Sequence, residues 1–331
     1  MSGFKSEIIV KQIDPSYFPR AAIFLEKMTN NEFPKELWID RFHLWWEDNP
    51  VFYAEKPSGW ILTDGENIVG FFAVIPVHYH FKGEEIPGHS ATSWFVDPEY
   101  RKHSLKLIAP FVKAEQPCLL INSTPSKDVA IKIFKYYKLT LLKQPWLKVF
   151  QLFPVQGSQL WCFLVGRKFG ESSFAEYLVK LDWLIGSIID FLQRCRISSL
   201  KNNSNPYSVR EIFYFSEDYN KLWEKFKNKY DLLAIRDSSR LNWFFFSSKN
   251  LSSLRRVLEI RNDLKLMGYV VVNVVRLPVK NRQYYFYDWI DSMIVGGGGE
   301  VYFAILRALY ELAAKDEKNI IGKLLFIDIN N

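Results

Sequence analysis

Residues 89–108 read HSATSWFVDPEYRKHSLKLI, and they place three kinds of structure in immediate succession. The first eight residues, which include β-branched and aromatic side chains, favour a strand. Asp97-Pro98 then marks a turn, because proline fixes its own backbone and restricts the residue before it. From Ser104 onward apolar residues recur at the spacing of one helix face. The segment therefore predicts a strand, a charged turn and a helix.

The residues on either side extend this pattern. Before the segment we expect a strand at 7–13, a helix opened by Asp14-Pro15, a helix at 35–48 and two strands within 59–81 that join at Asp64-Gly65. After it we expect a buried strand at 118–123 and a helix at 126–137. This order predicts an α+β fold with a mixed, partly parallel sheet sandwiched by helices.

The second half of the chain repeats the order of elements. Strands are expected at 209–215, 254–260, 266–277, 284–295 and 321–329, with helices at 217–229 and 300–314. The segment RFHLWW at 41–46 also resembles RLNWF at 240–244. We therefore expect a duplication with an N-terminal domain at 1–150, a connecting helix and polar linker at 151–207, and a C-terminal domain at 208–331 that lacks the final helix of the first copy.

Size and charge support two packed domains without a nucleic-acid partner. A chain of 331 residues with 48% hydrophobic residues is long enough for two cores. The net charge is +7 and the pI is about 9.0, which suits an anionic ligand or surface. The cations occur as singlets and pairs such as Arg101-Lys102 and Arg255-Arg256, so no basic arm for nucleic acid is expected.

The cysteines and the most apolar helix bear on location. Cys118, Cys162 and Cys195 lie far apart and form no metal or redox spacing, which favours a reducing cytoplasm. The N-terminus has no apolar core of a signal peptide. Residues 174–192 are apolar but include four charged side chains, so we expect a buried or interdomain helix and no membrane span.

Two segments carry a resemblance to a known family. VDPEYRKHSLKLI at 96–108 resembles the V-x-P-x-Y-R-G-x-G-x-G-x-x-L segment of GNAT acyltransferases, and KDVAIKIFKYYKL at 127–139 resembles their N-x-x-A-x-x-x-Y-x-x-x-G-F helix. The resemblance covers about residues 5–145, and the second half only by topology. It implies tandem GNAT-like domains and transfer of an acyl group from acetyl-CoA or another acyl-CoA to an amine of a small molecule, amino sugar or peptide.

The resemblance also implies where the acyl-CoA binds. A loop that feeds a helix N-terminus presents unpaired backbone N–H groups to a pyrophosphate, and a strand edge can pair with the pantetheine amides. Lys102, Ser104 and Lys106 stand where the family has glycines. Side-chain contacts to phosphate would then replace backbone contacts; the alternative is a solvated basic turn. The implied cofactor residues are Trp94, Phe95, Val96, Arg101, Lys102, His103, Ser104 and Lys106.

Catalysis of amine acylation needs a base for the ammonium and an acid for the leaving thiolate. His89 is the candidate base, and its alternative is a strand-end histidine in solvent. The position of the family's acidic tyrosine is Phe134 here, which leaves Tyr137 as the candidate acid, with aromatic packing as the alternative for it and for Tyr136. His78 and His80 share a strand face, but no third ligand fits, so we expect no metal.

Other readings of the sequence stay open. Gly296 to Gly299 precede a helix at the place that corresponds to the first half's phosphate turn, yet Glu300 would repel an anion, which favours a surface loop. The replaced glycines and Phe134 suit a tandem GNAT-like protein that has lost catalysis and acts as a binding protein. A Fem-type aminoacyl transferase that uses charged tRNA would share the tandem fold and the basic pI.

Overall fold

The chain forms two compact units in the computed structural model. Unit 1 comprises Met1–Leu142 and Lys227–Asn250, and unit 2 comprises Lys143–Phe226 and Leu251–Asn331. The structure describes residues 7–52, 58–113, 119–122, 129–140, 150–154, 157–170, 172–200, 205–248, 255–279, 282–296, 298–315 and 320–325. Of the residues singled out above, Cys118 and Gly297 lie outside this part of the chain.

Unit 1 is built on a sheet of order β1-β2-β3-β4-β5. Its strands are β1 Ile8–Gln12, β2 Gly59–Asp64, β3 Asn67–Phe81, β4 Glu84–Val96 and β5 Leu119–Asn122. Neighbouring strands are antiparallel except β4 and β5, which are joined by a helical crossover and run parallel. The mixed sheet predicted from the sequence is confirmed.

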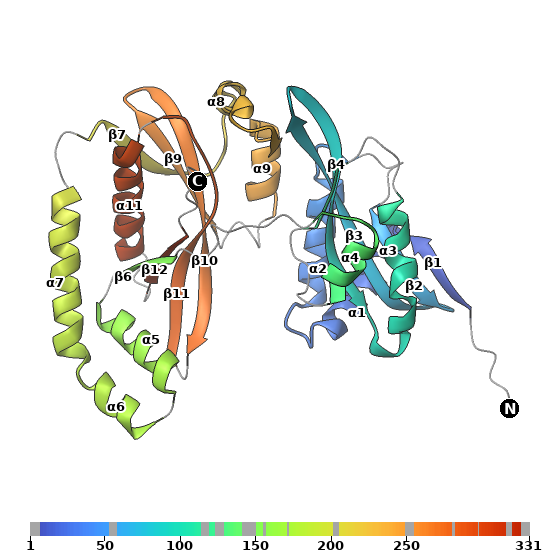
Figure 1. The fold of residues 1–331 in the computed structure, drawn as a ribbon, viewed down its shortest axis with the longest axis horizontal. Helices are drawn as coiled ribbons and strands as arrows, with labels where there is room; N and C mark the ends of the chain where they lie inside the picture. The colour runs from blue at the N-terminus through green and yellow to red at the C-terminus, as the bar shows by residue number, and fades with distance from the viewer. Residues whose placement is uncertain are drawn as a thin grey trace. The chain divides into compact units, whose positions relative to one another are not determined.

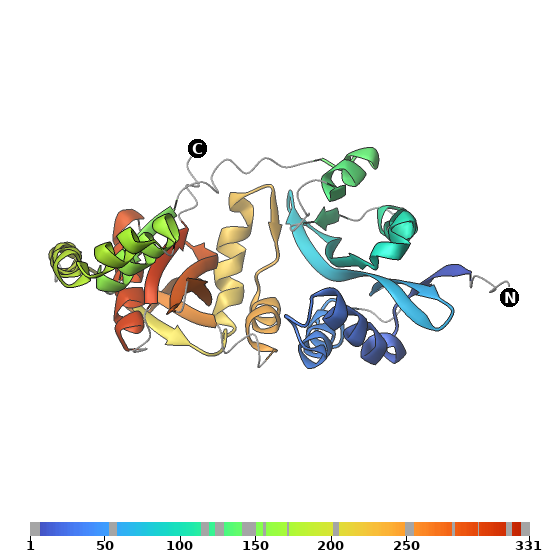
Figure 2. The ribbon, with the colours of Figure 1, turned by 90° about the horizontal axis from the view of Figure 1, so that it is seen from below.

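Helices cover both faces of this sheet (Figure 2). One face carries η1 Pro15–Tyr17, α1 Phe18–Met28, α2 Lys35–Phe42 and the π-helical turn η2 His43–Glu47, and the other carries η3 Pro98–His103, α3 Ser104–Val112 and α4 Val129–Tyr136. Adjacent residues of β3 serve opposite faces, since Phe71 packs in the core under α1 and α2, whereas Phe72 packs under α3. The helix expected at 35–48 thus ends in a π-helical turn.

Unit 2 contains a second sheet, of order β6-β12-β11-β10-β9-β7. The strands are β6 Phe150–Pro154, β7 Tyr207–Ile212, β9 Arg255–Asn262, β10 Lys265–Val279, β11 Arg282–Ile294 and β12 Ile320–Leu325. The helices are α5 Gly157–Phe169, α6 Ser173–Val179, α7 Asp182–Leu200, α8 Asp218–Phe226 and α11 Gly298–Lys315. Helices α8 and α11 lie on opposite faces (Figure 1), and β11 and β12 are the parallel pair.

The irregularities of the two sheets also correspond. In unit 1 one extra residue lies in β3 opposite β2 and another in β4 opposite β3. In unit 2 the extra residues lie in β10 opposite β9 and in β11 opposite β10. Strands β3 and β10 each have 15 residues, and β4 and β11 each have 13. Because bulges are specific local features, matching bulges strengthen the case for duplication.

A segment of the second half of the sequence belongs to unit 1. Strand β8, Leu232–Ala234, pairs antiparallel with the far end of β3, and helix α9, Ser238–Phe246, packs beside η2. The indole Nε1 of Trp243 donates to the Leu44 carbonyl at 2.6 Å. Ser248 Oγ donates to Asp40 Oδ2 at 2.7 Å. The range 208–331 that the sequence suggests for the second domain includes this segment.

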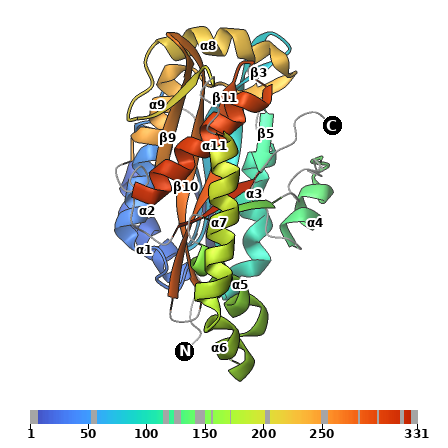
Figure 3. The same ribbon diagram turned by 90° about the vertical axis from the view of Figure 1, so that its left-hand side faces the viewer.

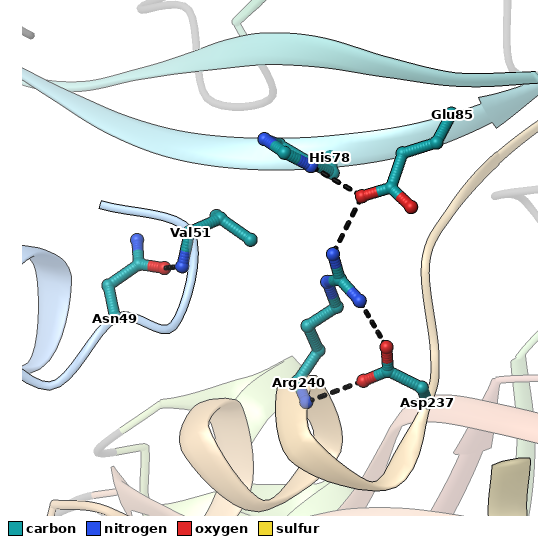
Figure 4. A network of polar contacts seen from close by, with 6 residues as sticks. All are labelled: Asn49, Val51, His78, Glu85, Asp237 and Arg240. Carbon is teal, nitrogen blue, oxygen red and sulfur yellow. Dashed lines mark hydrogen bonds and ion pairs between the residues drawn. The ribbon is translucent and has the colours of Figure 1, made fainter. Parts of the chain in front are cut away.

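Polar contacts join α9 to the β3–β4 hairpin (Figure 4). Arg240 donates to Glu85 Oε1 at 2.7 Å and pairs with Asp237, which also accepts from the Arg240 backbone N–H and so caps α9. His78 Nδ1 lies 2.5 Å from Glu85 Oε1. This chain of side chains fixes the start of α9 on the hairpin.

Three elements differ from the sequence-based expectations. Strand β6 and helix α5 occupy residues 150–169, where no regular pattern was evident. The helix expected at 174–192 is two helices, α6 and α7. It was expected to be buried or to lie between the domains, and burial is wrong, because Trp183 and Phe191 are more than 60% exposed.

Candidate functional site

Strand β4 bulges before its final stretch. The last described pair of the β4–β5 ladder is Ala91 opposite Asn122, and β4 runs on to Val96. Just beyond Ala91 β4 bulges, and Ser93 adopts a φ of 51°, which is uncommon for a residue with a Cβ. The bulge sets apart the final stretch of β4, which includes the predicted residues Trp94, Phe95 and Val96.

The turn after β4 is anchored on the neighbouring strands. The Asp97 backbone N–H donates to the Val69 carbonyl at 2.9 Å, and the Tyr100 hydroxyl donates to Asp64 at the β2–β3 turn. This hydrogen bond is the main cause that raises the pKa of Tyr100. The carboxylate of Asp97 accepts from the Glu99 backbone N–H at 3.2 Å and so caps η3. The start of α3 is therefore held in a fixed position.

The predicted phosphate residues converge at this turn. Arg101, Lys102 and Lys106 are exposed, while His103 and Ser104 are half-buried. Ser104 Oγ donates to the Arg101 carbonyl at 2.7 Å. The pKa of His103 is lowered by desolvation and then by the charges of Lys106 and Lys102. Positive side chains thus share the first turn of α3 with the positive end of the helix dipole.

The two candidate catalytic residues lie near the end of the β4–β5 ladder. His89 is in the middle of β4, opposite Pro76 on β3 and Leu120 on β5, and its side chain is buried. The alternative of a strand-end histidine in solvent is therefore wrong. Tyr137 follows α4 and packs against the same core as Trp94 and Leu120. The side chain of Phe134 lies outside the part of the chain that the structure describes.

On the opposite face of the sheet, an arginine lies among aromatic rings. The guanidinium of Arg41 is 4.8 Å from the ring centre of Phe33 and 4.7 Å from that of Trp38. Burial lowers the pKa of Arg41. Trp38 is also in edge contact with Phe95 of β4, at 6.3 Å between ring centres. Across the described ranges Arg41 forms no ion pair, which leaves a desolvated cation near the bulge.

Sequence reasoning did not single out Arg41 as a candidate. It lies in the segment RFHLWW, which served only to identify the repeat. The available signal was a cation surrounded at helical spacing by aromatic residues, a pattern typical of cation–π contacts. The contact with Phe33, which lies outside α2, depends on the fold, whereas Trp38 lies on the same helix as Arg41.

The glycine run of unit 2 is explained by the backbone conformation of its turn. Gly296 and Gly298 have φ values of 78° and 50°, in the region that favours glycine. Glu300 is exposed in the first turn of α11, and its backbone carbonyl accepts from Asn205 Nδ2 at 3.1 Å. A carboxylate at this helix N-terminus disfavours an anion. The geometry thus agrees better with a loop that needs glycine for its shape.

The two strand histidines of β3 have separate partners. His78 faces Glu85, as above, and His80 Nε2 lies 3.2 Å from Asn228 Oδ1 of the segment that precedes β8. Among the residues that the structure describes, no group of three potential metal ligands occurs. In the same residues, no helix is long and apolar enough to cross a membrane.

Comparison with solved structures identifies the fold. Structures of Saccharomyces cerevisiae N-myristoyltransferase with bound myristoyl-CoA match 97–98% of this chain and 73–78% of theirs, with TM-scores of 0.52–0.53 and 11–12% identity. A probable N-acyltransferase from Enterococcus faecalis matches 96% of this chain and 65% of its own, with a TM-score of 0.50 and 8% identity. No family model matches the chain, and no curated protein matches it.

These matches cover nearly the whole chain, including both sheets. The fold is GNAT-like and is present twice, as the sequence resemblance implied. At these identities the likeness concerns the fold, so the activity has to be argued from the site itself.

Proposed function

We propose that the chain is an acyl-CoA-dependent N-acyltransferase whose acyl-CoA binds to unit 1. The observation that carries the proposal is the anchored turn after β4, where Arg101, Lys102 and Lys106 surround the start of α3. Their charges, with His103 and Ser104, would hold the phosphates. The pantetheine would pair with the edge of β4 between Trp94 and Val96, beyond the last described pair of the β4–β5 ladder.

The chemistry proposed is direct aminolysis of the thioester. The amine nitrogen attacks the carbonyl carbon, a C–N bond forms, and the C–S bond breaks as the thiolate leaves. His89 would take one proton of the acceptor ammonium through water, Tyr137 would give a proton to the thiolate, and the second proton of the nitrogen, lost after attack, would restore Tyr137. No covalent enzyme intermediate is required. The donor is acetyl-CoA or an acyl-CoA with a longer chain.

Arg41 favours an acceptor that carries a carboxylate. A desolvated guanidinium stacked on Phe33 and Trp38 would bind a carboxylate in bidentate geometry, and it lies one ring away from Phe95 beside the bulge of β4. Amino acids and peptides offer both the amine and the carboxylate, whereas simple amino sugars lack the carboxylate. The proposed acceptor is therefore an amino acid or a peptide.

The proposed location is the cytoplasm, where acyl-CoA would be supplied and thiols stay reduced. Both cysteines that the structure describes are free, Cys162 in the interior of unit 2 and Cys195 exposed on α7. An exposed free thiol suits a reducing compartment.

A binding protein without catalysis is the second candidate. It is favoured by one observation, the charged and hydroxyl side chains of Lys102, Ser104 and Lys106 in place of glycines. Such side chains can hold a phosphate by charge while the backbone stays too distant to position the thioester. Binding and turnover therefore have to be measured separately.

The test is a thermal unfolding series with free CoA, acetyl-CoA and longer acyl-CoAs, followed by an amine-acylation assay with amino acids and short peptides. A ligand at about 100 times its Kd stabilises the native state by about 2.7 kcal/mol. We expect stabilisation by CoA ligands together with release of free thiol in the presence of acceptor. Stabilisation without thiol release would favour the binding protein, and no stabilisation by any CoA ligand would refute both.

A further inference from the structure

The helix pair α6–α7 leaves large apolar side chains exposed, although part of α7 packs on α5. Both helices form an outer layer of unit 2 on α5 (Figure 3). Two carboxylates of α7 face α5: Asp190 Oδ1 accepts from the Gly157 backbone N–H at 2.6 Å, and Asp182 Oδ2 lies 3.9 Å from Cys162 Sγ. The α5–α7 contact is close, since a Cβ at Gly157 would lie 2.3 Å from the carbonyl oxygen of Gly186.

The outward side carries a continuous set of large apolar side chains. Seven of them are between 45% and 69% exposed and form what we term the α6–α7 face: Phe174, Tyr177, Trp183, Leu184, Ile188, Phe191 and Leu192. On α7 the spacing 184, 188, 191 and 192 places them along one side of the helix. Phe169 at the end of α5 is in edge contact with Phe174 and extends the face.

Such a face is unfavourable in water. Each square ångström of apolar surface kept from water is worth about 25 cal/mol, and monomeric proteins rarely expose contiguous apolar patches of this kind unless something binds there. An ordinary surface helix of a globular protein turns its apolar side to the core, as α8 does with Tyr219, Leu222, Trp223 and Phe226. Helix α7 packs Ile189 on the core at α5 but leaves Ile188 and Phe191 exposed within the same unit.

We infer that the α6–α7 face binds the surface of a lipid bilayer. Its composition fits the membrane interface, because Trp183 and Tyr177 combine an apolar ring with a polar group and the aliphatic side chains lie beside them. Asp182 and Asp190 are half-buried on the side of α7 that faces α5, away from the exposed apolar side chains. The helices lie on the membrane, since neither is apolar enough to span it.

Charge supports an anionic lipid surface as the partner. Lys168 and Lys180 are exposed next to the α6–α7 face, and the Lys168 ammonium lies 5.4 Å from the ring centre of Phe169, with its stem along apolar surface. The exposed carboxylate of Glu176 on α6 has the opposite charge and offsets one of these two lysines. Over the whole chain the net charge is +7, which draws the protein to a negative surface before the apolar face inserts.

The test is co-sedimentation of the full chain with phosphatidylcholine vesicles, with and without phosphatidylglycerol. We expect the wild type to sediment with the anionic vesicles. Ile188→Lys with Phe191→Lys should weaken that binding about tenfold or more, since two apolar groups no longer enter the interface. The matched control is Leu264→Lys, which changes a 93% exposed leucine of the same unit outside the face and should bind as the wild type does.

Thermal unfolding of each variant shows whether it is folded. Because the substituted positions are exposed, the substitutions should leave the midpoint of thermal unfolding unchanged. Failure of the wild type to bind either vesicle would overturn the inference. Equal binding by the double variant and the wild type would also do so, because charge alone would then explain the interaction. Sedimentation velocity without lipid tests whether a second copy of the chain covers the α6–α7 face. If the wild type is a dimer and the double variant is a monomer, the face is a dimer interface and the lipid inference is wrong.

Discussion

Lys102, Ser104 and Lys106 change how an anion is held at the start of α3. A glycine loop binds phosphate through backbone N–H groups at short range, and the contact changes little with salt. Exposed lysines and arginines act through charge, which salt screens over about 8 Å at physiological ionic strength. The lowered pKa of His103 reflects desolvation and the two lysines. At this turn the side chains therefore have to supply most of the attraction for a phosphate.

We expect Arg101→Ala with Lys106→Ala to weaken acetyl-CoA binding at least about tenfold, because each charge-assisted contact contributes about 1.5 to 3 kcal/mol. Isothermal titration at two salt concentrations measures it, and higher salt should weaken the wild type more than the double variant. Lys113→Ala, an exposed lysine at the other end of α3, is the matched control and should bind normally. An unchanged double variant, with binding lost when Gly296 to Gly299 become alanine, would move the site to unit 2.

Strand β9 of unit 2 contains a buried charge that ties three elements together. Glu259 accepts hydrogen bonds from Arg210 of β7 at 2.8 Å, from Arg261 at 2.7 Å and from the Tyr219 hydroxyl of α8 at 3.1 Å. Burial would raise the pKa of Glu259, but the hydrogen bonds and charges of Arg261 and Arg210 outweigh it and lower the pKa. Burial and the same carboxylate raise the pKa of Tyr219.

Glu259→Gln should lower the free energy of unfolding by about 2 kcal/mol at neutral pH, since the arginines and Tyr219 lose a charged acceptor. The folded-state pKa of Glu259 is depressed, so its stabilisation is present above the unfolded pKa and is lost as pH falls through the folded value. Urea unfolding across that range should therefore show the difference between variant and wild type shrinking in acid. Glu311→Gln, from an exposed pair with Arg307, should cost little at any pH. A constant difference would contradict this account of Glu259.

Across the whole molecule, local signals were predictable and long-range ones were not. Asp64-Gly65 predicted the β2–β3 hairpin and Asp14-Pro15 the start of the helical segment, because turn and cap chemistry acts within a few residues. The turn proposed to bind phosphate rests on a motif of contiguous residues. The exposure of the apolar side of α7 was not evident, since periodicity gives the apolar side but not which side meets the protein.

The place of Lys227–Asn250 in unit 1 also escaped sequence reasoning, because it depends on pairing between residues far apart in the chain. Strand β8 pairs with β3, where Tyr79 lies opposite Ala234. The Asn228 and Trp243 side chains reach His80 and the Leu44 carbonyl of the first half. Unit 1 is therefore incomplete when the chain is divided at residue 150, the boundary that the element order alone suggests.

We expect a fragment of residues 1–150 to be less stable than the same fragment joined by a flexible linker to residues 227–250. Removing the segment uncovers the far end of β3 and takes away Trp243, which is buried and hydrogen-bonded. Loss of one buried tryptophan alone costs about 3 to 5 kcal/mol, so the difference in urea unfolding should be at least that large. A joined fragment with Trp243→Ala is the control and should behave more like the bare fragment. Equal stability of the bare and joined fragments would mean that residues 1–150 fold independently of the segment, and the sequence-based boundary would then describe the folding unit better than the contacts do.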